Sequence, residues 1–161
     1  MSRRRFLVRS LALASAAAAG LPLAAAVAPA AAIVPVVRSE EEWKKRLTPA
    51  QFSVLRHEGT ERPFSSPLND EKRNGTFTCA GCDLPLFDSR TKYDSGTGWP
   101  SFWDCIAGHV ATKVDYRLVW PRTEYHCARC GGHQGHVFDD GPKPTGLRYC
   151  NNGVALKFVP A

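Results

Sequence analysis

Six cysteines carry the clearest chemistry in this sequence, and their spacing divides them into four and two. One Cys-x-x-Cys pair is Cys79 with Cys82, and the other is Cys127 with Cys130. This spacing lets both thiolates of a knuckle turn toward one tetrahedral ion, so the two pairs predict a single structural Zn²⁺ that is closed to water. The alternatives are two redox dithiols or a crossed pair of disulfides. Neither pair has the strand-to-helix context of a thioredoxin motif, which favours the metal.

Cys105 and Cys150 remain without a metal to bind, which leaves them free to attack or to be oxidised. Arg148 stands two residues before Cys150, and a neighbouring cation can lower the pKa of a thiol and raise its thiolate fraction. The alternative is a buried or disulfide-bonded cysteine beside a surface arginine. His133 and His136 lie three residues apart and suit proton transfer, although a structural role is open for at least one of them.

Trp99 lies in a segment, residues 95–102, that combines two glycines and a proline with two aromatic residues. This composition predicts a loop. A tryptophan on a loop can form the wall of a pocket for an apolar group, including a methyl-sulfur centre, or it can anchor the core.

The elements that position these residues begin with two short helices, predicted over residues 40–46 and 49–57. Capping boxes begin both of them: Ser39 with Glu42, and Thr48 with Gln51. A polar stretch, residues 58–74, predicts a wrapping loop.

The remainder of the chain is β-rich. Short β-prone runs occur at residues 76–79, 116–120, 124–127, 136–138 and 154–158. Each cysteine knuckle directly follows one of these predicted strands. Because 44 residues separate the two knuckles, a large insertion must lie between the halves of the metal site.

The first 32 residues have the layout of an export signal. Three consecutive arginines precede an alanine-rich apolar run, which is typical of a twin-arginine leader. We therefore expect a signal peptide at residues 1–32 and one domain at residues 33–161. The twin-arginine route would deliver this domain to the periplasm, with membrane contact only during export. The alternative is an uncleaved membrane anchor, which a glycine and two prolines within the run disfavour.

The charge of the chain gives little sign of a nucleic-acid partner. The 161 residues carry a formal net charge of +6. Four arginines lie in the expected leader, so its removal leaves a net charge near +2. Nucleic-acid binding is not indicated by so small an excess. The remaining domain can bury a modest core, to which a zinc ion adds stability.

Taken together, these residues resemble the B-type methionine-R-sulfoxide reductases, the family that reduces the R epimer of peptide-bound methionine sulfoxide. The resemblance runs from about Ser39 to Phe158. Besides the two cysteine pairs, its matching pieces are Glu42-Trp43, Leu47-Thr48-Pro49, Gly59-Thr60-Glu61, Lys92-Tyr93-Asp94-Ser95-Gly96, Gly98-Trp99-Pro100-Ser101-Phe102, Gly135-His136-Val137-Phe138, Gly141-Pro142, Pro144-Thr145-Gly146 and Arg148-Tyr149-Cys150. The resemblance implies a mainly β fold of two antiparallel sheets with short N-terminal helices, and a four-cysteine zinc site opposite the active site.

The resemblance also implies a reaction. Cys150 matches the family's nucleophile, whose thiolate would attack the sulfoxide sulfur, release methionine and leave a sulfenic acid. His136 and His133 match active-site histidines, and one of them would protonate the departing oxygen, with His136 the stronger candidate.

Three further matches imply supporting roles. Trp99 would pack against the methyl group of the substrate, while Arg148 and Asn152 would support the thiolate and the polar network. The implied substrates are oxidised proteins or peptides that contain methionine sulfoxide. A thioredoxin-like protein is the implied reductant.

Two positions depart from the family pattern. Thr97 occupies the place where many members have a resolving cysteine, so we expect Cys105 to resolve the sulfenic acid of Cys150. The alternative is that Cys105 has no redox role and Cys150 is reduced directly. The segment after the nucleophile reads Asn151-Asn152-Gly153, which keeps the family's asparagine and loses its serine.

Two other functions are open on the sequence. A zinc-knuckle domain could bind a partner without redox chemistry, but it would have no need for Cys150 beside Arg148 and two histidines. An exported thiol-disulfide exchange protein would act on partner disulfides and not on sulfoxides.

Overall fold

The computed structural model describes residues 32–161, and the fold is built from this part of the chain. The predicted leader lies outside the described residues, except for Ala32. Within the described part, no helix has both the length and the apolar character that crossing a membrane requires.

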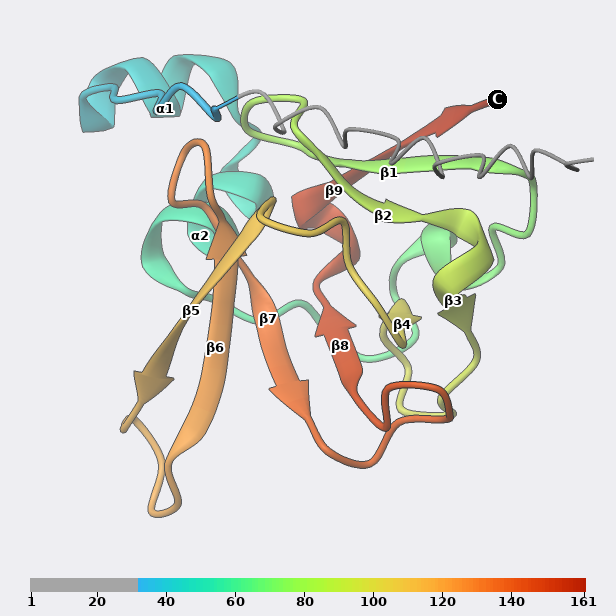
Figure 1. Cartoon of the computed structure of the whole chain (residues 1–161). Helices are drawn as coiled ribbons and strands as arrows, with labels where there is room; N and C mark the ends of the chain where they lie inside the picture. Colours follow the sequence, from blue (N-terminus) through green and yellow to red (C-terminus); the bar gives the residue numbers. More distant parts are fainter. Residues whose placement is uncertain (1–31) are drawn as a thin grey trace, which may run out of the picture. The chain divides into compact units, whose positions relative to one another are not determined.

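The two predicted helices are confirmed, because their caps are encoded locally. Helix α1 spans Glu40–Arg46 and helix α2 spans Pro49–His57, and each begins with a complete capping box. The helices bury Trp43, Val54 and Leu55. Helix α2 contacts strand β7 (His133–Phe138) and the 3₁₀ turn η3 (Gly153–Ala155), so the helical start packs beside the larger sheet (Figure 1).

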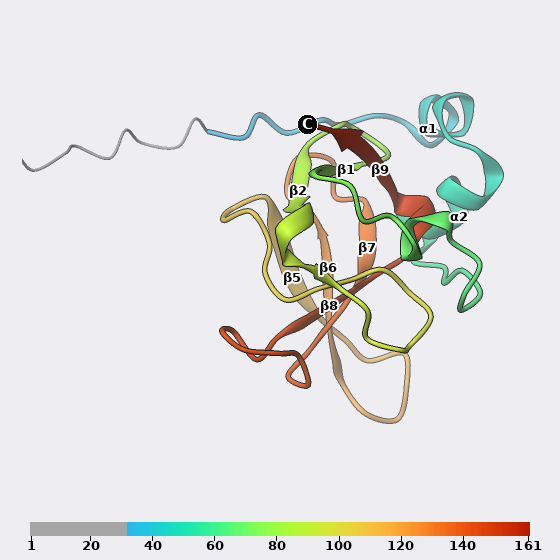
Figure 2. The same ribbon diagram turned by 90° about the vertical axis from the view of Figure 1, so that its right-hand side faces the viewer.

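Within residues 32–161, nine strands form two antiparallel sheets, which confirms the predicted fold class. The smaller sheet has the order β2-β1-β9, and the larger one has the order β3-β4-β8-β7-β6-β5. The strands are β1 Gly75–Cys79, β2 Pro85–Asp88, β3 Lys92–Tyr93, β4 Ser101–Phe102, β5 Val110–Asp115, β6 Arg122–Cys127, β7 His133–Phe138, β8 Arg148–Asn151 and β9 Leu156–Pro160. Three 3₁₀ turns accompany them: η1 Pro67–Asn69, η2 Ser89–Thr91 and η3 Gly153–Ala155. The two groups of strands can be followed in Figures 1 and 2.

Aromatic side chains from both sheets form the core. Phe87 of the smaller sheet stacks on Phe102 of the larger one, with ring centroids 4.1 Å apart. Phe77 meets Phe102 edge to face, and Tyr125 meets Phe87 in the same way. All four side chains are fully buried. This contact fixes which face of the larger sheet is apolar and leaves the other face for polar residues.

The predicted strand at residues 116–120 is wrong. These residues form the connection between β5 and β6, and the strand that precedes them is Val110–Asp115. The Asp115 side chain accepts a hydrogen bond from the Arg117 backbone amide at 2.9 Å, which begins the turn. Pro121 has no amide proton for a ladder at the end of this connection. Residues 116–120 are therefore β-prone in composition but form part of a hairpin loop.

Candidate active site and metal centre

Five residues form a row across one face of the larger sheet. Register places Ser101 opposite Cys150, Cys150 opposite His136, His136 opposite Glu124, and Glu124 opposite Lys113. Residues that face one another across antiparallel strands project from the same side of a sheet. The thiol of Cys150 is therefore flanked by a hydroxyl on one neighbouring strand and by an imidazole on the other.

A cavity of about 130 Å³ opens beside Cys150. Its wall includes Trp99, His136, Phe138, Cys150 and Asn152. Four of these five residues are predicted site residues, and Phe138 adds a second aromatic ring. The cavity thus combines a thiol and an imidazole with an apolar surface that suits a methyl-sulfur group.

The thiol of Cys150 has mixed electrostatic surroundings. Burial raises the pKa of Cys150, while the Arg148 guanidinium and the Thr97 hydroxyl both lower it. Arg148 also donates two hydrogen bonds, at 2.8 and 2.7 Å, to Asp140, and it lies 4.3 Å above the Phe138 ring. The cation is therefore shared with a carboxylate, and the pKa of Cys150 is raised on balance. Arg148 lowers the pKa of Cys150 as expected, but the effect of burial is larger.

His136 is held by a carboxylate. Its Nε2 lies 2.8 Å from Oδ2 of Asp115, and an ionised carboxylate only accepts hydrogen bonds, so Nε2 carries a proton. Hydrogen bonds from the Arg117 amide and from His136 hold the pKa of Asp115 below its usual range. Arg122 adds an ion pair to Asp115 at 2.6 Å. Burial lowers the pKa of His136, and the Asp115 hydrogen bond partly opposes this effect.

His133 has a more enclosed position. Its side chain is only 3% exposed, and its Nδ1 lies 2.6 Å from Oε1 of Glu124. The other oxygen of Glu124 lies 2.9 Å from Nδ1 of His126. Burial raises the pKa of Glu124, but hydrogen bonds from the two rings outweigh it, so the pKa falls to about 2. The His133 ring lies 5.5 Å from that of His136, and His133 is absent from the residues that line the Cys150 cavity.

Glu61, for which no role was predicted, connects the pieces of the cavity wall. Its backbone carbonyl accepts a hydrogen bond from Nε1 of Trp99 at 3.1 Å, and its amide donates to Oδ1 of Asn152 at 3.0 Å. Its carboxylate accepts from the amides of Gly153 and Val154. Burial raises the pKa of Glu61, while these amides oppose the effect. The signal for it in the sequence is its place in Gly59-Thr60-Glu61, one of the segments that match the family.

The structure does not bring Cys105 to Cys150. Cys105 lines a different cavity, together with Trp103 and Ile106, and it lies within hydrogen-bonding reach of Tyr149. Tyr149 and Cys150 are consecutive residues of β8, so their side chains project from opposite faces of the sheet. Burial raises the pKa of Cys105. The thiols of Cys105 and Cys150 are thus placed on different sides of the larger sheet.

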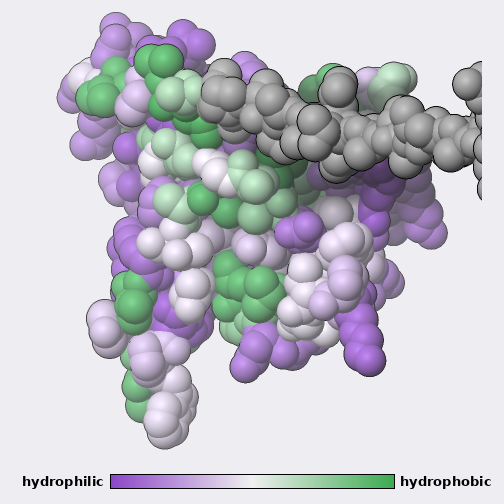
Figure 3. Space-filling view, in the orientation of Figure 1, coloured by the Kyte–Doolittle hydropathy of each residue, from purple (hydrophilic) through white to green (hydrophobic). Residues whose placement is uncertain are grey.

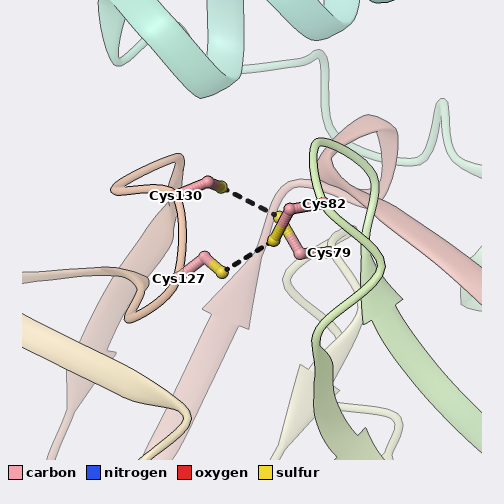
Figure 4. A group of neighbouring side chains, drawn as sticks. All are labelled: Cys79, Cys82, Cys127 and Cys130. Atoms are coloured by element: carbon pink, nitrogen blue, oxygen red, sulfur yellow. Dashed lines mark hydrogen bonds between the residues drawn. The ribbon is translucent and has the colours of Figure 1, made fainter. Parts of the chain in front are cut away.

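The four remaining cysteines form a cluster at the ends of β1 and β6 that can hold a metal ion. Their sulfurs all lie within 4.8 Å of one another, and Figure 4 shows the two knuckles facing each other. Sγ of Cys79 lies 3.7 Å from that of Cys130, and Sγ of Cys82 lies 3.4 Å from that of Cys127. A tetrahedral site with bonds of about 2.3 Å has sulfurs about 3.8 Å apart, so the spacing fits such a site.

Sequence comparisons relate this chain to known proteins. The SelR domain matches residues 47–160. The chain is 57% identical to peptide methionine sulfoxide reductase MsrB of Methanosarcina barkeri, over 76% of this chain and 87% of that protein. The MsrB of Bradyrhizobium diazoefficiens is 52% identical, over 78% of this chain and 91% of that protein. Peptide methionine sulfoxide reductase B1, chloroplastic, of Arabidopsis thaliana is 56% identical over 74% of this chain, which spans 59% of that longer protein.

Proposed function

The chain belongs to the SelR domain family of peptide methionine sulfoxide reductases, and from this premise we propose that Cys150 reduces the R epimer of methionine sulfoxide in oxidised polypeptides. The homology makes the enzyme a peptide-methionine (R)-S-oxide reductase. One observation carries the assignment of the site: Cys150 and His136 face each other across neighbouring strands and share one cavity. A nucleophile and a proton donor on either side of a sulfoxide are the groups that the reaction needs.

The chemical step transfers oxygen from one sulfur to another. The Cys150 thiolate attacks the sulfoxide sulfur, the sulfur-oxygen bond breaks, and the oxygen leaves with a proton. The products are methionine and a sulfenic acid on Cys150, so the substrate sulfur is reduced by two electrons and the cysteine sulfur is oxidised by two. The high pKa of Cys150 makes the thiolate a minor but strongly nucleophilic species.

His136 delivers the proton in this proposal. Asp115 engages Nε2, so the proton to be delivered is carried at Nδ1 of the imidazolium. A lowered pKa makes the imidazolium a stronger acid, which favours transfer to the sulfoxide oxygen. His133, which is enclosed and bound to Glu124, packs beside His136 and keeps its ring in place.

The cavity wall selects and orients the substrate. Trp99 and Phe138 offer apolar surface to the methyl group of the sulfoxide. Asn152 bridges two elements, because Oδ1 accepts from the Glu61 amide and Nδ2 donates to the Gln134 carbonyl at 3.0 Å. Such fixed partners hold Trp99 and the nucleophile strand in one arrangement.

Two thiols must return Cys150 to its reduced state. The first condenses with the sulfenic acid to give a disulfide and water, and the second reduces that disulfide. The placement of Cys105 on the other side of the sheet favours direct attack by a thioredoxin-like reductant. Resolution by Cys105 would require the two thiols, which line different cavities, to come into contact.

We also propose that the cysteine cluster holds one Zn²⁺. Cys79, Cys82, Cys127 and Cys130 would supply four thiolates, a donor set that suits zinc and leaves no open position for catalysis. The ion would cross-link the knuckle after β1 to the knuckle after β6, and so join the smaller sheet to the larger one.

We further propose that the protein is exported. The arginine cluster and the alanine-rich run of residues 1–32 support a twin-arginine leader and a periplasmic site of action. This route carries folded proteins, which suits a metal bound before export.

The assay that tests the function uses the purified protein, dithiothreitol, and peptides that contain one epimer of methionine sulfoxide. We expect turnover of the R epimer and none of the S epimer, with activity lost in Cys150→Ser. Failure to reduce the R epimer would overturn the function. Reduction of a disulfide partner without any sulfoxide turnover would instead identify a thiol-disulfide exchange protein.

A further inference from the structure

The connection between β5 and β6 exposes an unusual amount of apolar surface. We call residues 116–121 the apolar loop. Its large side chains are 58 to 91% exposed: Tyr116 77%, Leu118 58%, Val119 91% and Trp120 79%. Val114, at the end of β5, is also exposed. Figure 3 shows hydrophobic atoms along this projecting hairpin at the lower left of the view. Exposed apolar groups gathered in this way mark an interaction surface.

The base of the apolar loop is anchored to the rest of the domain. The backbone amide of Arg117 donates a hydrogen bond to the Asp115 side chain at 2.9 Å, and the Arg117 guanidinium forms an ion pair with Glu58 at 3.0 Å. Its guanidinium also reaches the backbone carbonyls of His57 and Glu58. These contacts hold the loop against the end of α2. The apolar side chains are therefore presented on a fixed base.

Both ends of the apolar loop belong to the active site. Asp115, which precedes it, holds the ring of His136. Arg122, which follows it, lines the Cys150 cavity and pairs with Asp115. A polypeptide whose side chain enters this cavity therefore lies beside Arg122, the residue that follows the loop. The loop is thus continuous with the wall of the catalytic cavity.

We propose that the apolar loop docks the apolar residues that flank methionine sulfoxide in an unfolded polypeptide. The inference rests on the proposed function and names its substrate class. Methionine packs in apolar cores, and its oxidation to a polar sulfoxide disrupts that packing and exposes the surrounding apolar residues. A cavity of about 130 Å³ can take the oxidised side chain alone. The rest of the client must lie outside it, where the loop offers a complementary surface.

The test compares two substrates and a matched control. The substrates are N-acetyl-methionine-R-sulfoxide amide, and a reduced, alkylated protein oxidised at methionine; dithiothreitol is the reductant. The variants are Val119→Ser and Val119→Ser/Trp120→Ser, and the control is Val37→Ser, because Val37 and Val119 are both 91% exposed. We expect the double variant to lose about tenfold in kcat/KM on the unfolded protein, through KM, and to keep wild-type activity on the small sulfoxide.

A second measurement separates docking from chemistry. The same alkylated protein without oxidation should inhibit turnover of the small sulfoxide by the wild type and by Val37→Ser, and should inhibit the double variant several-fold less. Equal losses on both substrates, no loss on the protein, or an equal loss in Val37→Ser would each overturn the docking role. A concentration-dependent dimer that only the double variant loses would overturn it in favour of self-association. Wild-type inactivity on the small sulfoxide would overturn the function itself, and this inference with it.

Discussion

Cys150 and His136 lie directly opposite each other on β8 and β7, and their neighbours Tyr149 and Val137 form the next pair on the opposite face of the same two strands. Residues that line the cavity and residues that pack in the core therefore alternate along each strand. Tyr149 packs against the aromatic core, with its ring centroid 5.3 Å from that of Tyr125. The position of Cys150 is thus fixed by the packing of the residue before it.

Cys105→Ser tests the route of recycling. Because Cys105 and Cys150 lie on different sides of the sheet, direct reduction of Cys150 does not use Cys105. We therefore expect the variant to keep its steady-state rate within about twofold, with dithiothreitol or with a thioredoxin as the reductant. Thiols titrated after a single turnover should show no internal disulfide in either form. A disulfide between Cys105 and Cys150 in the wild type, lost in the variant, would establish Cys105 as the resolving cysteine.

The pH dependence of kcat/KM should be a broad plateau. Burial lowers the pKa of His136 and raises that of Cys150, so the two pKa values lie on either side of neutral pH, with that of His136 the lower. At acid pH both groups are protonated and the thiolate is lost, whereas at alkaline pH both are deprotonated and the acid is lost. Between the two pKa values one proton is shared by the pair, so activity stays level.

Two variants identify the group behind the acid limb of this profile. His136→Asn should remove the plateau, leaving a lower activity that rises with pH toward the pKa of Cys150. Asp115→Asn should move the acid limb to lower pH, because the lost hydrogen bond had raised the pKa of His136. An unchanged profile in His136→Asn would show that another group supplies the proton.

Metal analysis should find one zinc ion per chain. Removal of the ion by a strong chelator should unfold the domain or lower its Tm markedly, since a structural zinc site contributes about 10 kcal/mol to folding. Cys130→Ser should lose zinc and stability together, while Cys105→Ser serves as the matched control and should keep both. Full zinc occupancy in Cys130→Ser would exclude the four-thiolate site.

We expect export to depend on the arginine pair Arg3-Arg4 of the proposed leader. Arg3→Lys/Arg4→Lys should leave the protein in the cytoplasm with residues 1–32 attached, because lysine is a poor substitute in a twin-arginine signal. Arg9→Lys lies outside the pair and should be exported normally. Cell fractionation and N-terminal sequencing report the outcome, and undiminished export of the double variant would contradict the twin-arginine route.

The features that could be predicted from the sequence are those formed by residues close together along the chain. The caps of α1 and α2 and the two cysteine knuckles involve residues at most three apart, so their patterns are visible along the chain. Asp115 and Glu124 were missed as partners of the histidines because strand register brings them together, and register depends on pairing across the sheet. Glu61 was missed as a supporting residue because its hydrogen bonds join a loop to Trp99 and Asn152, which are far away along the chain.

The error at residues 116–120 has a related cause. An apolar, β-prone run is typical of a buried strand. Here Asp115 turns the chain and leaves Leu118, Val119 and Trp120 in solvent. Propensity describes how residues fit a pleated, half-buried surface, and no such surface exists at the end of this hairpin. The resemblance supplied the identities of Cys150 and His136, whereas their facing positions required the fold.

The central position of β8 in its sheet has a consequence for the order of events. The strand is paired with β4 on one side and β7 on the other, so the backbone of Cys150 cannot move toward a reductant without breaking the hydrogen bonds between strands. Every partner must come to a stationary sulfur. The oxidised client and the reductant would then visit the thiol in turn, one leaving before the other arrives, and the turnover rate would be governed by that exchange as much as by the chemistry.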